Sequence, residues 1–218
     1  MRQELDDLLC SRYPGIFRDR HGTAQTTAMC WGFTCGDGWF DLLDVLCAEI
    51  ERHARETGLD AVAVQVKEKF GSLRVHIHGG DDYIRGLIGM AGSLSQSVCE
   101  ECGLPGVTPS KERMKALCSL HAETAPDQEP TEAPPRFGGD ADFSRLLRLP
   151  PIRTERWQHI ALALEKTLSQ AIRYSCMPMI LIDEAIETES LSFRWHGGDD
   201  KGHAKAFFRL VEAYSIRV

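Results

Sequence analysis

The sequence predicts an α+β protein made of two copies of a helix–strand–strand–helix unit, with a small zinc finger between them. Three observations support this prediction. Residues 72–82 return as residues 190–200 with seven of eleven positions identical. A cluster of cysteines and a histidine lies between the copies, and apolar residues on either side of it follow helical and strand periods.

Composition limits the class of protein. With 218 residues, 43 % of them hydrophobic, the chain is long enough for one full domain or two small ones with buried cores. No apolar run approaches the roughly 20 residues of a membrane span, and residues 1–6 lack a signal-peptide core. We therefore expect a folded cytoplasmic protein with no membrane partner. There, the eight cysteines favour metal ligation or buried thiols over disulfides. A net charge of −7 argues against a generic phosphate-backbone binder.

The first part of the chain predicts an arm, a strand and a long helix. Residues 3–17 start with a helical pattern that Tyr13-Pro14-Gly15 ends. Alternation over residues 29–35 predicts a strand that runs into a turn at 36–38. A helix should then extend to a stop at Gly58, since one stripe holds its apolar residues, namely Trp39, Leu42, Leu43, Leu46, Cys47 and Ile50.

A β-hairpin and a second helix complete the first unit. Residues 62–66 and 73–77 alternate around a turn at 67–71, which is typical of a hairpin. Asp81 and Asp82 then stand where helix caps are expected. The helix that follows is indicated by apolar residues at helical spacing, namely Ile84, Leu87, Ile88, Ala91 and Leu94.

The second unit repeats this order at a constant offset. Trp157, Ile160, Leu164, Leu168 and Ile182 stand 118 positions after Trp39, Leu42, Leu46, Ile50 and Val64. Lys201-Gly202 is interpreted as a two-residue insertion. After it, the apolar residues of the helix that begins near Ile84 recur at an offset of 120, as Ala204, Phe207, Phe208, Val211 and Tyr214. A register kept over about sixty residues indicates an internal duplication.

The duplication predicts an arrangement and a set of domain boundaries. Two hairpins are marginal alone, so we expect the copies to pack about a pseudo-twofold axis as one four-stranded antiparallel sheet with helices on one side. The predicted divisions are an N-terminal arm with the first unit (1–98), a zinc finger (99–122), an acidic proline-rich linker with a docking segment (123–152) and the second unit (153–218). Packing within one chain, swapping between chains and a homodimer are left open.

The cysteine cluster has the spacing of a metal site. Cys99, Cys102, Cys118 and His121 form C-x2-C-x15-C-x2-H. A thiolate knuckle and a second pair at i, i+3 on a helix start can converge tetrahedrally on Zn²⁺, and Gly103 lets backbone amides turn towards the sulfurs. Four protein ligands leave no position for water, so the predicted zinc is structural. Separate buried thiols with an exposed histidine are the alternative.

Two resemblances involve this finger. Residues 99–103 with Pro105, Arg113 and 117–118 resemble the finger of the DksA/TraR transcription factors, which insert an acidic coiled-coil tip into RNA polymerase. Here His121 replaces the last cysteine of that pattern, and no long coiled coil precedes the finger. The resemblance covers about 25 residues and implies a finger more than an activity.

The second resemblance is wider. Residues 35–40, residues 67–74, the Cys99/Cys102 pair and residues 117–122 together resemble an uncharacterised family of phage and prophage proteins. This resemblance implies a phage or mobile-element origin and no established activity. Small phage proteins of this kind often redirect or block host machinery, which is an inference by association.

Other candidate sites have plainer interpretations. His76, His78, Asp81 and Asp82 offer Zn or Mn ligands, but helix capping is the favoured role of the aspartates. Cys30 and Cys35, with Cys47 or Cys10, form a weak candidate for a second metal site or redox pair. The chain lacks a G-x-S-x-G elbow, a P-loop and an H-E-x-x-H motif. Two basic stretches, 67–74 and 111–115, offer contacts for phosphate, with a solvated turn as the favoured reading of the first.

These observations favour a non-enzymatic, zinc-stabilised phage accessory protein that binds a host protein complex. The complex would be a defence effector, as for anti-CRISPR proteins, or the transcription machinery. The second hypothesis is a zinc-finger regulator that binds nucleic acid through residues 111–115. The third is a metal-dependent enzyme that uses the face with His76, His78, Asp81 and Asp82.

Overall fold

The computed structural model describes residues 1–106, 115–124, 147, 149–174, 177–198 and 201–218. The first half contains α1 (Gln3–Arg12), α2 (Phe40–Thr57), β1 (Val62–Lys69), β2 (Ser72–His78) and α3 (Asp82–Ser95). After α4 (Ser119–Thr124), the second half contains α5 (Glu155–Tyr174), β3 (Ile180–Glu187), β4 (Leu191–Gly197) and α6 (His203–Ser215). Helices and antiparallel strands in separate segments make this an α+β fold, as predicted.

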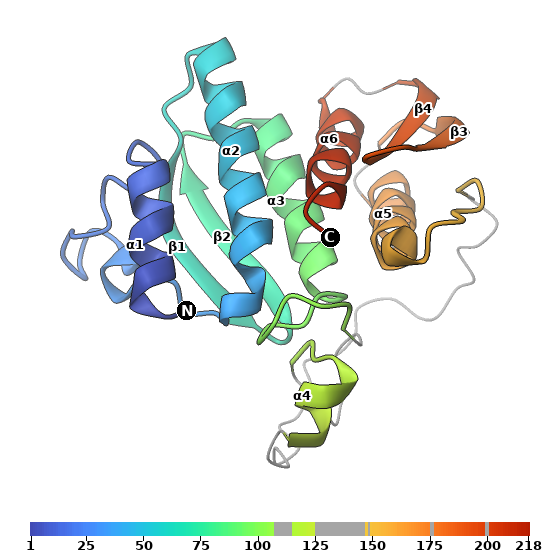
Figure 1. The fold of residues 1–218 in the computed structure, drawn as a ribbon. Coiled ribbons are helices and arrows are strands. Elements are labelled where there is room, and N and C mark those ends of the chain that lie inside the picture. The colour runs from blue at the N-terminus through green and yellow to red at the C-terminus, as the bar shows by residue number, and fades with distance from the viewer. Residues whose placement is uncertain (107–114, 125–146, 148, 175–176, 199–200) are drawn as a thin grey trace.

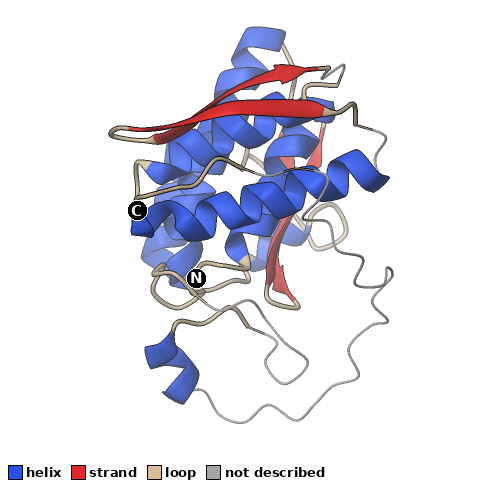
Figure 2. Ribbon diagram, turned by 90° about the vertical axis from the view of Figure 1, so that its right-hand side faces the viewer, coloured by secondary structure: helices blue, strands red, loops and turns tan. Residues whose placement is uncertain are grey.

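The two hairpins do not join into one sheet. β1 pairs with β2 and β3 with β4, and the part of the chain that the structure describes has two separate two-stranded antiparallel sheets. The predicted four-stranded sheet is therefore wrong. α3 and α6 lie between the hairpins (Figures 1 and 2), because α3 packs on β2, α6 packs on β4, and these two helices pack on each other. Each hairpin buries its apolar face against helices of its own half.

The crossing of α3 and α6 is a close approach of two backbones. A Cβ added to Gly86 would lie 2.9 Å from Ala206 Cβ and 3.3 Å from the Cα of His203. Gly86 and Ala206 are separated by the offset of 120 that aligns the two predicted copies. The halves thus meet at matched positions, and the glycine is required by space rather than by its backbone angles.

Gly86→Ala tests this contact. Alanine is the better helix former by about 1 kcal/mol, but its methyl group would overpack the crossing at a cost of about 1–3 kcal/mol. Gly89 lies in the same helix with nothing within 4 Å of an added Cβ, so Gly89→Ala is the matched control. In urea unfolding, Gly86→Ala should be about 1.5 kcal/mol or more less stable than Gly89→Ala. Equal stabilities would mean that the helices do not meet here.

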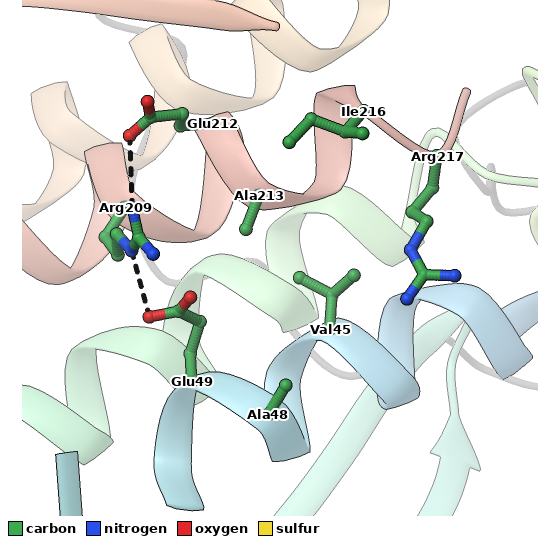
Figure 3. Close-up of a pocket in the computed structure, with 8 residues that line it drawn as sticks. All are labelled: Val45, Ala48, Glu49, Arg209, Glu212, Ala213, Ile216 and Arg217. Atoms are coloured by element: carbon green, nitrogen blue, oxygen red, sulfur yellow. Dashed lines mark hydrogen bonds and ion pairs between the residues drawn. The ribbon is translucent and has the colours of Figure 1, made fainter. Parts of the chain in front are cut away.

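Two ion pairs also join the halves, from α2 to α6 and to Arg217, which follows α6. Arg209 Nε lies 3.1 Å from Glu49 Oε2, and a nitrogen of Arg217 lies 2.9 Å from Asp44 Oδ2. They border a cavity of about 270 Å³, whose apolar lining includes Val45, Ala48, Ala213 and Ile216 (Figure 3). Because both arginines already pair with buried carboxylates, they serve the contact between halves.

The predicted strand over residues 29–35 is wrong. Residues 28–31 form a 3₁₀ helix, η1 (Ala28–Trp31), capped by Thr27 Oγ1, which accepts from the Met29 amide. Gly32 at φ 76° then turns the chain out of an extended path. Thr34 alone makes a ladder contact in this segment, a parallel bridge to Lys67. The alternation in the sequence therefore reflects burial of Met29, Phe33 and Cys35 rather than a strand.

The ends of α1 and α2 and the start of α3 follow the sequence closely. α1 ends at Arg12, before the predicted Tyr13-Pro14-Gly15 stop, and Gly58 ends α2 in the left-handed region at φ 75°. Asp81 caps α3, since its Oδ1 accepts from the Ile84 amide at 2.9 Å, which confirms the capping role for Asp81. The same prediction is wrong for Asp82, which is the first residue of α3 and pairs with Arg85.

The register of the second hairpin differs from the prediction by one residue. Ile182 lies opposite Trp195, whereas Ala63, rather than Val64, lies opposite Ile77. Between the matched pairs Glu68–Leu73 and Glu187–Leu191, the first hairpin has four residues and the second has three, which accounts for the shift. The strand match at an offset of 118 is thus corrected to 119 along β3.

Most of the predicted linker lies outside the described residues. Its end is described: Leu147 is buried, and Leu149 and Ile152 pack against the core, in keeping with a docking segment. Among the helices in the described ranges, none has the length and apolar character needed to cross a bilayer.

Candidate metal centre

The four predicted ligands come together in one cluster. The ligand atoms of Cys99, Cys102, Cys118 and His121 all lie within 4.8 Å of one another. Cys102 Sγ and Cys118 Sγ are 3.7 Å apart, and His121 Nδ1 lies 3.5 Å from Cys99 Sγ and 3.3 Å from Cys118 Sγ. The sequence spacing therefore predicted the grouping of these side chains.

The cluster has the dimensions of a tetrahedral zinc site. With zinc–sulfur bonds of about 2.3 Å and zinc–nitrogen bonds of about 2.1 Å, a regular tetrahedron separates two sulfurs by about 3.8 Å and a sulfur from a nitrogen by about 3.6 Å. The observed separations of 3.7, 3.5 and 3.3 Å agree with these values. Three thiolates and an imidazole are a donor set that suits a metal such as zinc.

Local hydrogen bonds shape both ligand pairs. In the Cys99–Cys102 knuckle, the Cys99 amide donates to Leu104 O at 2.7 Å and the Gly103 amide donates to Cys99 O at 2.9 Å. Gly103 has φ 80°, a conformation that favours glycine. Cys118 and His121 lie one turn apart at the start of α4, where the Ala122 amide donates to Cys118 O at 2.9 Å. Each pair is thus held by its own backbone turn.

The thiols differ in acidity. The backbone N–H of His121 donates towards Cys118 Sγ and is the main cause that lowers the pKa of Cys118 to about 6. Desolvation is the main cause that raises the pKa of Cys102 to about 11. The two directions favour release of the thiol proton from Cys118 over release from Cys102, and zinc binds the thiolate form.

The knuckle rests directly on the first half of the molecule. The Gly38 amide donates to Glu100 O at 2.8 Å, and Trp39 Nε1 donates to Val98 O at 3.0 Å. A Cβ added to Gly38 would lie only 2.2 Å from Cys99 O, 2.4 Å from Gly103 N and 2.7 Å from Cys102 N. The chain at Gly38 therefore touches the backbone that positions the first two ligands.

Glu100 strengthens this contact from inside the knuckle. Its side chain is buried, and Oε1 accepts from the Gly36 amide at 2.9 Å. Lys115 Nζ lies 3.8 Å from Oε2, and burial raises the pKa of this carboxyl above its usual value. The sequence analysis assigned no role to Gly36, Gly38 or Glu100. The paired glycines around Asp37 were the available signal of a close backbone approach.

The other candidate ligands have different roles. Asp81 holds the α3 terminus and His53 Nε2 at 2.8 Å, and Asp82 pairs with Arg85 at 2.7 Å. Across the described ranges, the group that meets metal-ligand geometry is the Cys99 cluster, and His76 and His78 do not join Asp81 and Asp82 in another. Sequence analysis missed His53, whose ring stacks on Tyr83 with centroids 4.2 Å apart.

The remaining cysteines do not gather either. Cys35 and Cys47 are buried, and burial raises the pKa of both thiols, that of Cys35 to about 12. Cys30 Sγ donates to Thr27 O at 3.2 Å, and Cys10 Sγ donates to Asp6 Oδ1 at 3.6 Å. Within the described residues these four thiols behave as small buried or half-buried side chains rather than as a second metal centre.

Comparisons with known proteins give no match: no protein-family model, curated protein or solved structure is similar to this chain.

Proposed function

We propose that this chain is a non-enzymatic accessory protein of phage or mobile-element origin, stabilised by zinc, that binds and modulates a host protein complex. The target would be a defence effector or the transcription machinery. Support comes from the sequence resemblance, the acidic net charge of −7 and the chemistry of the metal cluster. Four protein ligands fill a tetrahedral shell, so the zinc would hold a structure in place and would activate no water.

The main support for the proposal is that two leucine side chains beside the metal centre are exposed to solvent. Leu104 is 55 % exposed and Leu120 is 69 % exposed. Leu104 supplies the carbonyl that fixes the Cys99 amide, and Leu120 stands between Cys118 and His121. Both leucines are therefore held in place by the residues that would bind zinc. Exposed apolar side chains on a preorganised turn are typical anchors for a protein partner.

The position of the finger supports the same use. α4 projects away from the helical body in Figure 1, and the knuckle joins it to the first half through Gly38 and Glu100. A rigidly attached projection can enter a recess of a partner with little loss of conformational entropy. A finger loosely tethered on both sides would have no such advantage.

We infer that the two halves arose by duplication. The Leu73 amide donates to Ser95 Oγ at 2.9 Å, and the Leu191 amide donates to Ser215 Oγ at 2.7 Å. These partners are related by the offsets of 118 and 120 found in the sequence. The metal cluster has no counterpart among the described residues of the second half, so the finger would be the part added for binding.

A capture experiment tests the proposal. Tagged, zinc-loaded full-length protein is passed over nuclease-treated bacterial lysate beside a Leu104→Ser/Leu120→Ser variant and a Leu162→Ser control, since Leu162 on α5 is 67 % exposed and distant in sequence from the finger. We expect a stoichiometric protein partner that the control retains and the finger variant loses by about tenfold or more. Zinc content should be equal in all three.

Two results would contradict the proposal. One is equal retention of the partner by the finger variant, which would remove Leu104 and Leu120 from the interface. The other is retention of no protein by the wild type. The second hypothesis, in which the finger binds nucleic acid through residues 111–115, has no support from the described residues. Residues 111–114 lie outside the described part of the chain, and Lys115 Nζ pairs with Glu101 at 3.3 Å.

A further inference from the structure

The outer face of the β1–β2 hairpin is basic. Side chains alternate along β1, so Val66 faces the core while Lys67 and Lys69 face outwards. The ladder places Arg74 opposite Lys67 and His76 opposite Gln65, on the same outer face. Glu68, the acidic residue between the two lysines, has the opposite orientation and lies across from Leu73. The cationic side chains thus lie on the outer face of the hairpin, and Glu68 lies on the other face.

This arrangement costs the fold stability. Like charges directly opposite each other on a sheet are destabilising. Lys67 and Arg74 form such a pair, and in the part of the chain that the structure describes neither makes an ion pair. A protein with a net charge of −7 has acidic residues to spare for neutralising them. The fold gives no reason for this unneutralised pair, whereas a bound polyanion would neutralise both charges.

The same face is hollowed and polar beside the cations. A shallow depression of about 550 Å³ is lined in part by hydroxyl, amide and imidazole side chains, namely Gln25, Thr26, Gln65, His76 and His78, and in part by apolar residues, namely Ala24, Ala28, Val64 and Ile77. Phosphate and sugar oxygens are bound by such groups in proteins that hold nucleic-acid backbones. The depression continues the line of Lys67 and Arg74 along the hairpin, since Gln65 and His76 form the neighbouring cross-strand pair.

Exposed aromatic residues lie in the turn of this hairpin and in η1, beside β1. Phe70 in the β1–β2 turn is 46 % exposed and has φ 56°, a conformation that a bulky residue adopts at a cost. Lys69 Nζ lies 5.3 Å from the centre of its ring. Trp31, 64 % exposed, lies in η1, which packs against β1. Aromatic faces next to cations are what unpaired bases stack on.

We propose that the outer face of the β1–β2 hairpin binds single-stranded nucleic acid. Lys67, Lys69 and Arg74 contact phosphates, and Phe70 stacks on a base. Residues two apart on a strand lie about 7 Å apart, a spacing suited to successive phosphates of an extended strand. This surface is separate from the leucines of the finger, so the inference goes beyond the proposed function and does not depend on it.

The second hairpin shows that the basic face is particular to the first half. On β3–β4, Arg194 pairs with Glu184 at 3.1 Å and His196 with Asp183 at 3.0 Å. There the outward cations have carboxylate partners, whereas Lys67 and Arg74 face each other. A polyanion would be attracted to the first sheet and not to the second.

Fluorescence anisotropy with a labelled oligothymidine of about 20 nucleotides tests the proposal on zinc-loaded full-length protein at near-physiological salt. Lys67→Ala/Arg74→Ala should raise Kd by about tenfold or more and reduce the slope of log K against log salt by about 1.4. The matched control is Lys166→Ala/Arg194→Ala, with the same change in net charge on other elements, and should leave Kd within about twofold. Phe70→Asn, which tolerates the left-handed backbone, should weaken binding without loss of stability.

A measurement of stability separates loss of binding from loss of folding in these variants. Because it removes a like-charge pair, Lys67→Ala/Arg74→Ala should unfold at the same or a higher urea concentration than the wild type, so weaker binding cannot be attributed to misfolding. Equal affinity of the two double variants would overturn the proposal, as would absence of binding by the wild type. Binding of a duplex of the same length as tightly as the single strand would refute the assignment to single strands.

Discussion

Removal of the metal should lower the free energy of unfolding by about 4 kcal/mol or more. Without it, the sulfurs of Cys99, Cys102 and Cys118 lie close together with no metal bond between them, and hydrogen bonds alone hold the two ligand pairs in place. Loss of the knuckle would also leave the Trp39 indole N–H without Val98 O and the Gly38 amide without Glu100 O. Urea unfolding with and without a zinc chelator measures the change, and added zinc should reverse it.

A pair of cysteine variants supplies the control for this result. Cys118→Ser removes a ligand and should reproduce the effect of the chelator. Cys30→Ser keeps the hydrogen bond to Thr27 O, which Cys30 Sγ makes at 3.2 Å, and should change stability by less than about 0.5 kcal/mol. If chelation left the unfolding curve unchanged, or if Cys30→Ser were as harmful as Cys118→Ser, the metal would not be structural.

Gly38→Ala should be nearly as severe, at about 3 kcal/mol or more. Its Cβ would meet three backbone atoms of the knuckle, among them Cys99 O at 2.2 Å, and backbone yields far less easily than a side-chain tip. Either the 36–39 loop moves or the knuckle distorts. We therefore expect lower affinity for zinc as well as lower stability, measured by competition with a chromophoric chelator and by urea unfolding.

Gly15→Ala is the matched control for this change. Gly15 also lies in a loop of the first half, and an added Cβ would meet nothing within 4 Å. That variant should keep wild-type zinc affinity and a stability within about 0.5 kcal/mol of the wild type. Wild-type zinc affinity in Gly38→Ala would show that the loop and the knuckle are independent, contrary to the packing described above.

Local features of the fold were predictable from sequence where one residue decides them. Gly58 ends α2, Asp81 caps α3, and the C-x2-C and C-x2-H spacings bring four ligands together, as expected. Each depends on contacts within a few residues, which periodicity and spacing describe directly.

Long-range features were predicted less well, for physical reasons. The two-residue alternation over residues 29–35 is shared by a strand and by an irregular segment whose alternate side chains reach the core. The four-stranded sheet failed because α3 and α6 buried their apolar stripes against each other, a choice that depends on the space left by Gly86 at the crossing. Gly36 and Gly38 gave no sign of what they approach, since Glu100 and Cys99 lie over sixty residues away in the chain.

The central claim is that Cys99, Cys102, Cys118 and His121 hold one structural zinc. Native mass spectrometry of the purified protein, with metal content measured in parallel, tests it most directly. We expect one zinc per chain in the wild type, none in Cys118→Ser, and one in Cys30→Ser. A wild-type chain without metal, or a zinc retained at full stoichiometry by Cys118→Ser, would contradict the account.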